Sequence, residues 1–150
     1  MSAVAIVDTS VLLNVLDVPQ RNQDRDAVLK ELESLIDEGT NILLPMASII
    51  ETGNHISRIA NGDARRQCAK RFADQVRMAL AGDAPWQPMQ TPTRGDVGIW
   101  IDEFPDFATR KLSIADLSIV KEWEAVCKRI KRIRIYIWSL DKHLSAYNRE

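Results

Sequence analysis

Four acidic residues stand beside segments that we expect to be strands or inward helix faces: Asp8, Glu51, Asp116 and Asp141. Carboxylates that gather at one end of a sheet repel one another unless a positive charge lies between them. Divalent cations are the usual source of that charge. Two such ions about 4 Å apart activate a water and neutralise the leaving oxygen of a phosphodiester. The pattern therefore predicts a metal-dependent phosphodiesterase.

Asp116 is the strongest single signal, because it interrupts an apolar helix face. At about 100° per residue, the face of a helix over 113–129 is formed by Ile119, Val120, Trp123, Val126, Cys127 and Ile130. Asp116 projects into this face, where an unpaired carboxylate costs free energy or takes up a proton. The alternative is a helix cap, because Ser113 and Asp116 have the spacing of a capping box.

Asp8 and Asp141 each follow an apolar segment and precede a helical one. In open α/β sheets, ligands bind outside the carboxyl ends of the strands, which is where both residues fall. The alternative for each is again capping, since Asp is a favoured N-cap residue. His143 follows Asp141 closely, and a lone histidine in a first helical turn is typical of a surface position.

Glu51 is the weakest member of the set. The apolar stripe of its predicted helix, 46–60, is formed by Ile49, Ile50, Gly53, Ile56 and Ala60. Glu51 projects roughly opposite this stripe, so periodicity alone predicts a solvated surface residue. It joins the other acids only if its face of the helix looks toward the sheet edge.

The elements that must position these residues alternate between strands and helices. The predicted strands are 3–7, 41–44 and 133–138, and the main predicted helices are 11–16, about a dozen residues ending near 38–39, 46–60, 63–80 and 113–129. Asp63 is the expected cap of the helix over 63–80, which presents Cys68, Phe72, Val76 and Leu80 inward. This alternation predicts an α/β three-layer sandwich with a central, mainly parallel sheet.

Residues 82–104 contain the one clear shift in composition. Three prolines and three glycines fall between positions 82 and 98, around Trp86 and without a sustained period. We therefore predict a long surface excursion at about 82–104, with a short extended piece around 97–101.

Length and composition indicate one domain over residues 1–150. The two cysteines, Cys68 and Cys127, fall on apolar helix stripes, which favours buried free thiols in a reducing compartment. No apolar run approaches the roughly 18 residues that span a bilayer, and no secretory signal is evident. We expect a cytoplasmic protein with no membrane association.

The net charge of −1 means that any nucleic-acid binding must come from a local basic patch. The best candidates for RNA phosphate contacts, or for contacts with an acidic partner, lie on the helix over 63–80: Arg65, Arg66, Lys70, Arg71 and Arg77. The alternative is a solvated helix face. The basic run at 128–134 joins a helix end to the start of a strand, on the edge opposite the acids, where the helix dipole explains it.

Four segments resemble, in order, the four motifs of PIN-domain nucleases. AIVDTSVLLNVLD resembles the opening motif, a strand that delivers an aspartate followed by Thr or Ser. LPMASIIE resembles the second motif, which carries a glutamate, and LSIAD the third, an aspartate at the start of a long helix. IYIWSLDKHL resembles the fourth, with Ser or Thr two residues before an aspartate. Each motif is short, but together they span nearly the whole chain.

The resemblance implies a role for each matched residue. Asp8, Glu51, Asp116 and Asp141 would be the metal-binding and catalytic acids, and Thr9, Ser10 and Ser139 would be hydroxyls that orient them or a metal-bound water. Hard oxygen ligands without a Cys or His cluster suit Mg²⁺ or Mn²⁺ rather than zinc. The implied reaction is hydrolysis within single-stranded RNA.

Small single-domain PIN proteins are often toxins of toxin–antitoxin pairs, so the resemblance also implies a small antitoxin partner and a homodimer. The alternative is a PIN-like module that binds RNA or protein without cutting it. The sequence departs from compact PIN proteins in the longer interval between Glu51 and Asp116. Only nine residues follow Asp141, so we expect little room for a further strand.

Overall fold

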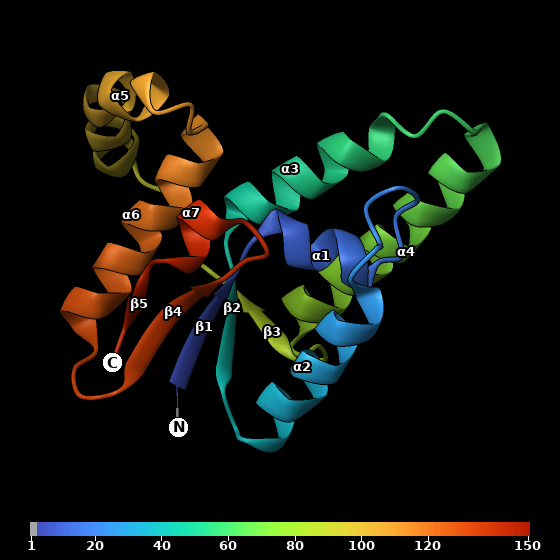
Figure 1. Cartoon of the computed structure of the whole chain (residues 1–150), viewed down its shortest axis with the longest axis horizontal. Coiled ribbons are helices and arrows are strands. Elements are labelled where there is room, and N and C mark those ends of the chain that lie inside the picture. Colours follow the sequence, from blue (N-terminus) through green and yellow to red (C-terminus); the bar gives the residue numbers. More distant parts are fainter. Residues whose placement is uncertain (1–2) are drawn as a thin grey trace.

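A twisted five-stranded sheet forms the centre of the computed structural model, which describes residues 3–150 (Figure 1). The strands are β1 (Ala3–Val7), β2 (Asn41–Leu44), β3 (Trp86–Pro88), β4 (Arg134–Trp138) and β5 (Asn148–Arg149). Their order across the sheet is β3-β2-β1-β4-β5. Neighbouring strands are parallel except for β5, which pairs antiparallel with β4. The near-continuous apolar runs of β1 and β2 suit strands that are covered on both faces.

Helices cover both faces of the sheet. They are α1 (Thr9–Val15), α2 (Arg25–Asp37), α3 (Met46–Ser57), α4 (Gly62–Ala81), α5 (Arg94–Thr109), α6 (Ile114–Arg129) and α7 (Lys142–Ser145). Because successive strand residues point to opposite faces, Ala5 and Val7 pack with side chains of α1, α2 and α4. Val4 and Ile6 pack on the other face, with side chains of α5, α6 and α7. The predicted α/β three-layer sandwich with a mainly parallel sheet is confirmed.

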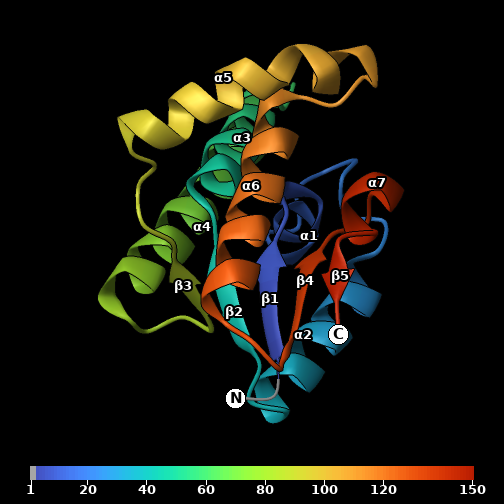
Figure 2. The same cartoon turned by 90° about the vertical axis from the view of Figure 1, so that its left-hand side faces the viewer.

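The carboxyl ends of the central strands meet at one edge of the sheet. β1 and β4 are adjacent and parallel, with Val7 beside Trp138, so the residues that follow them share that edge. The chain leaves β1 toward β2 on one side and returns to β4 on the other, which makes this pair the topological switch point. Figure 2 shows the arrowheads of β1 and β4 pointing toward the end where α1 and α7 begin. The N-terminal part of α6 packs beside α3 at the same end.

The surface excursion predicted at 82–104 is instead mostly regular structure. β3 adds a strand to the edge of the sheet, and a capping box between Thr93 and Asp96 starts α5. The extended piece predicted at 97–101 is wrong, because these residues lie within α5. Figure 2 shows α5 lying across the N-terminal end of α6. Tertiary pairing with β2 makes a strand of three residues that have little strand character alone.

Two details of α4 also differ from the prediction. The N-cap is Asn61, whose side chain accepts a hydrogen bond from the backbone of Ala64, rather than Asp63. Leu80 is 69% exposed, because Ala79 takes the inward position at the end of the helix. Cys68 is buried and Cys127 is half-buried, and both are free thiols.

The C-terminus contains a further strand, β5, where the sequence suggested little room for one. Its two residues suffice because the Arg149 guanidinium donates to the backbone oxygens of Cys127, Ile130 and Ile133. Within residues 3–150, no helix is long and apolar enough to cross a membrane.

Candidate active site

Asp8 is the most enclosed of the four predicted acids, with 5% of its surface exposed. It follows β1 and is the N-cap of α1. Its Oδ2 accepts hydrogen bonds from the hydroxyl of Ser10 at 2.9 Å and from that of Ser139 at 2.8 Å. The backbone N–H of Asp8 donates to Trp138 in β4. Two hydroxyls from separate strand ends therefore fix the orientation of this carboxylate.

The same two serines tie the end of β4 to the end of β1. The Ser139 hydroxyl accepts from the backbone N–H of Asp141, and the Ser10 hydroxyl accepts from that of Leu140. Asp141 is exposed and caps α7, where its Oδ1 accepts from the backbone of His143. His143 is exposed in the first turn of α7, as predicted.

Asp116 is half-buried in the first turn of α6, and the predicted capping box with Ser113 is present. Its Oδ2 accepts from the backbone N–H of Ser113, whose hydroxyl accepts from the N–H of Asp116. Burial raises the pKa of Asp116, the bonds to Ser113 oppose that rise, and the negative charges of Asp8 and Asp141 add to it. Asp116 thus caps its helix and also shares an electrostatic site with two other predicted acids.

Glu51 lies in the second turn of α3 and is half-buried rather than solvated. Burial is the largest cause of its raised pKa, followed by the negative charges of Asp116 and Asp8. The surface placement that periodicity favoured is therefore wrong. The buried face of α3 is formed by Ser48, Thr52 and Ile56, and Glu51 lies next to that face, whereas Ile50 is 55% exposed.

An apolar cleft of about 250 Å³ adjoins Glu51. Its walls come from the first turns of α3 and α6 and from α5, with Ile50, Trp100 and Ile114 among the lining residues. Apolar walls withhold water from a carboxylate and disfavour its charged form, which accounts for part of the burial effect on Glu51. The segment 82–104, which was predicted to be a surface excursion, therefore supplies one wall of the cleft beside Glu51.

Two buried polar residues that the sequence reasoning missed support this arrangement. The Ser48 hydroxyl donates to the backbone oxygen of Val7 at 2.6 Å, which joins α3 to the end of β1 next to Asp8. The Asn14 side chain donates to the backbone oxygen of Ser10 and accepts from the N–H of Asp24. No periodic signal marks either residue, because small polar side chains on buried faces look like ordinary helix surface.

The predicted ligand residues at this edge fit Mg²⁺ or Mn²⁺, since the four acids and the hydroxyls of Thr9, Ser10 and Ser139 all offer oxygen. The buried hydroxyl of Thr9 has no hydrogen-bond partner among the described residues, although it lies close enough to Glu51 to favour the charged form of that carboxylate. Within residues 3–150, no group of three or more His, Cys, Asp or Glu side chains is already arranged to hold a metal ion. The acids share one electrostatic neighbourhood, but they do not form a closed ligand cage.

The basic residues predicted on α4 divide into two groups. The Arg71 guanidinium donates to the backbone oxygens of Leu16 and Asp17, and that of Arg65 to those of Ile59 and Ala60. These two side chains hold loops in place.

The remaining basic side chains of α4 are more open. Arg66 and Lys70 are exposed, and Arg77 pairs with Asp74. Contact between RNA and Arg66 or Lys70 stays a prediction.

A solved structure with a similar fold is the "Crystal Structure of FitAcB from Neisseria gonorrhoeae". The match has a TM-score of 0.57 and 21% sequence identity, and it covers 91% of this chain and 87% of that chain. At this identity the likeness concerns the fold, and the architecture is consistent with a PIN-like fold. No protein-family model matches the chain, and no curated protein matches it in sequence.

Proposed function

We propose that this chain is a Mg²⁺- or Mn²⁺-dependent endoribonuclease that hydrolyses phosphodiester bonds in single-stranded RNA. The observation that carries the proposal is that acids from distant parts of the chain lie within electrostatic reach of Glu51 and Asp116. Asp8 and Asp116 each raise the pKa of Glu51, and Asp8 and Asp141 raise that of Asp116. Perturbed carboxyl groups at the switch point of a parallel sheet are typical of a functional site.

Each residue at this edge has a proposed task. Asp8 and Asp116 are the central metal ligands, and Glu51 and Asp141 complete the site. Every hydrogen bond described for the carboxylates of Asp8 and Asp116 goes to Oδ2, so Oδ1 of each has no hydrogen-bond partner among the described residues. When bound, the metal activates a water and offsets charge on the leaving oxygen.

Three hydroxyls assist the acids in this proposal. Ser10 and Ser139 hold Asp8 in one rotamer, so that little reorganisation accompanies binding. The hydroxyl of Thr9, which lies close to Glu51, orients that carboxylate or a metal-bound water.

We further propose that the protein is the toxin of a toxin–antitoxin pair, with a small antitoxin partner and a homodimeric state. The four motif resemblances and the PIN-like fold support this role. Inspection of the adjacent reading frame tests it. A small DNA-binding protein encoded directly upstream is the expected result, and a gene standing alone would count against the toxin role.

The nuclease proposal is tested with labelled single-stranded RNA and pure protein, with Mn²⁺ or with EDTA. Asp8→Asn and Asp116→Asn should each lower the cleavage rate at least ~100-fold, because each removes charge that holds the metal. Asp37→Asn is the matched control, since Asp37 is exposed at the end of α2. Cleavage that persists in EDTA, or in both site variants, would overturn the proposal.

A non-catalytic PIN-like module that binds RNA or protein is the second candidate function. One observation favours it: Asp8, Asp116 and Asp141 all cap helices, and no ready cage for a metal exists within residues 3–150. RNA binding that is retained without any metal-dependent cleavage would select the module over the enzyme.

A further inference from the structure

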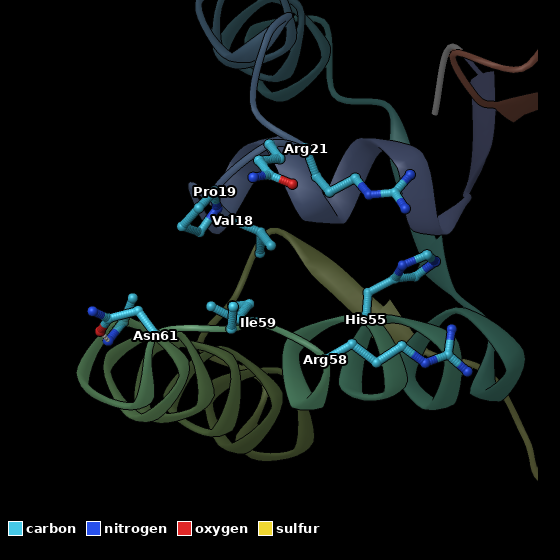
Figure 3. Close-up of a pocket in the computed structure, with 10 residues that line it drawn as sticks. Val18, Pro19, Arg21, His55, Arg58, Ile59 and Asn61 are labelled. Atoms are coloured by element: carbon cyan, nitrogen blue, oxygen red, sulfur yellow. Dashed lines mark hydrogen bonds between the residues drawn. The ribbon is translucent and has the colours of Figure 1, made fainter.

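A second cavity, of about 370 Å³, opens at the C-terminal end of α3 (Figure 3). It lies between the loop that follows α1 and the segment that joins α3 to α4. Arg21, His55 and Arg58 contribute cationic or titratable groups, and Asn61 contributes an amide. Pro19 and Ile59 form part of its apolar wall.

Two positively charged side chains, Arg21 and Arg58, line this cavity without an ion-pair partner among the described residues. Within residues 3–150, no carboxylate lies within ion-pair distance of Arg21 or Arg58, and neither guanidinium makes a hydrogen bond. Burial lowers the pKa of His55, and the positive charges of Arg21 and Arg58 lower it further. Clustered cations that neither pair nor anchor a loop are poised for an anion from outside the chain.

Helix α3 links the cavity to the candidate active site. Glu51, His55 and Arg58 stand at positions i, i+4 and i+7 of α3 and its C-cap, so they form one stripe along the helix. At 1.5 Å per residue, the stripe runs about 10 Å from the acidic end to the cationic end. The positive charge of Arg58 reaches Glu51, where it lowers the pKa of that carboxyl. Figure 3 shows the side chains of Arg21, His55 and Arg58 extending in the same direction.

We propose that this cavity is a phosphate subsite for the backbone of a single-stranded nucleic acid whose scissile bond lies at the acidic edge. The proposal rests on the proposed nuclease function and adds the strand's path along α3. Guanidinium groups recognise phosphate through two parallel hydrogen bonds, and apolar walls strengthen that attraction by excluding water. The two arginines come from different segments and both line the cavity, so each can contact a phosphate of the bound strand.

The chain offers a charge-matched control at the C-terminal end of α6. Lys128 and Arg129 are exposed, neither has an ion-pair partner among the described residues, and they lie at the opposite edge of the sheet from the acids. A general attraction between RNA and basic surface would weaken equally when either pair of charges is removed. A defined subsite would respond only to the cavity pair.

The experiment measures binding of a short fluorescent single-stranded RNA, with every variant in an Asp8→Asn background that stops cleavage. Arg21→Gln/Arg58→Gln should raise Kd at least ~10-fold, and the slope of log K against log salt should fall by about 1.4, because ~0.7 counterions are released per phosphate contact on a single strand. Lys128→Gln/Arg129→Gln should change Kd less than ~3-fold. Arg21→Lys/Arg58→Lys should recover part of the affinity, since the charge remains.

Three results would overturn the subsite. They are an unchanged Kd and salt slope for RNA in the cavity variant, an equal loss of affinity in the Lys128→Gln/Arg129→Gln control, or a cavity variant that loses binding to poly-glutamate but keeps its binding to RNA. Circular dichroism melts verify that each variant is folded, and both arginines are exposed, so little loss of stability is expected.

The subsite proposal and the nuclease proposal can be refuted independently of each other. Metal-dependent cleavage by the unmodified protein, together with an unchanged Kd in the cavity variant, refutes only the subsite. Cavity-dependent binding without cleavage by the unmodified protein refutes only the nuclease.

Discussion

At the scale of single residues, capping a helix and belonging to a site are compatible roles for a carboxylate. Asp116 completes a capping box with Ser113 and still has its pKa raised by Asp8 and Asp141. The carboxyl group has two oxygens, and the described backbone bonds of Asp116 use only Oδ2. Asp8 follows the same pattern, with Ser10 and Ser139 both bound to Oδ2. The cap sets where each carboxylate points, and the second oxygen has no hydrogen-bond partner among the described residues.

Glu51→Gln should stabilise the metal-free protein at pH 7. Because the pKa of Glu51 is raised in the folded state, the folded protein binds more protons than the unfolded chain, and stability falls as pH rises through the folded pKa. Glutamine removes this penalty, so Tm should rise at pH 7 by a few degrees at most.

The gain in Tm from Glu51→Gln should vanish as pH falls below about 4, where the carboxyl is protonated in both states. Thermal melts in EDTA at pH 4 and pH 7 measure this. Glu33→Gln, at an exposed position of α2, is the control. A pH-independent effect, or a lower Tm at pH 7, would contradict the prediction.

At the scale of elements, the position of α3 determines whether the acids form a site. α3 contacts α1, α4 and α6, so its sides are covered by different neighbours. Its buried face is formed partly by small polar residues, Ser48 and Thr52, which allow close approach to the strand ends. The hydrogen bond from Ser48 to Val7 ties the first turn of α3 to β1, one residue before Asp8.

Ser48→Ala should lower the free energy of unfolding by about 1–3 kcal/mol, because a buried hydrogen bond is lost and the oxygen of Val7 loses that partner. It should also slow RNA cleavage, since Glu51 sits on the helix that this bond positions. Urea unfolding measures the first effect and the RNA assay the second.

Ser57→Ala is the comparison for Ser48→Ala. Its hydroxyl bonds to Asn54 at the exposed end of the same helix, so the change should stay within about 0.5 kcal/mol. Equal effects of the two substitutions would show that the bond from Ser48 has no special role.

At the scale of the whole molecule, a chain with a net charge of −1 separates its charges locally. Acids converge at the carboxyl edge of the sheet, while Arg21 and Arg58 gather in the adjacent cavity. The basic run at 128–134 begins at the C-terminal end of α6 and leads into β4, at the opposite edge from the acids, as predicted. Acidic and basic groups are therefore concentrated on different surfaces, although they nearly cancel over the whole chain.

Mn²⁺ should raise the Tm of the intact protein, because a cation that binds only the folded state stabilises it. At a hundredfold excess over Kd the gain is about 2.7 kcal/mol, or several degrees for a chain of this size. Asp8→Asn/Asp116→Asn should abolish the shift, and Asp37→Asn should retain it. Differential scanning calorimetry measures the Tm of each variant with and without Mn²⁺. An undiminished Tm shift in the double variant would contradict a metal site at these acids.

Local sequence patterns were sufficient to predict secondary structure wherever a segment determines its own conformation. Ala3–Val7 and Asn41–Leu44 were predicted residue for residue, because apolar runs bounded by Asp8 and Pro45 admit few alternatives. The capping box at Ser113 was predicted for the same reason, since its spacing lies within one helical turn.

Tertiary structure decided the features that depend on neighbours. β3 exists because β2 offers an edge to pair with, and Leu80 is exposed because α4 ends beyond its packing partners. Glu51 joins the acids because several helices cover α3, and an apolar stripe reports burial only for a helix with one covered side. Sequence periodicity records what each element prefers, whereas the assembled layers determine which of those preferences are met.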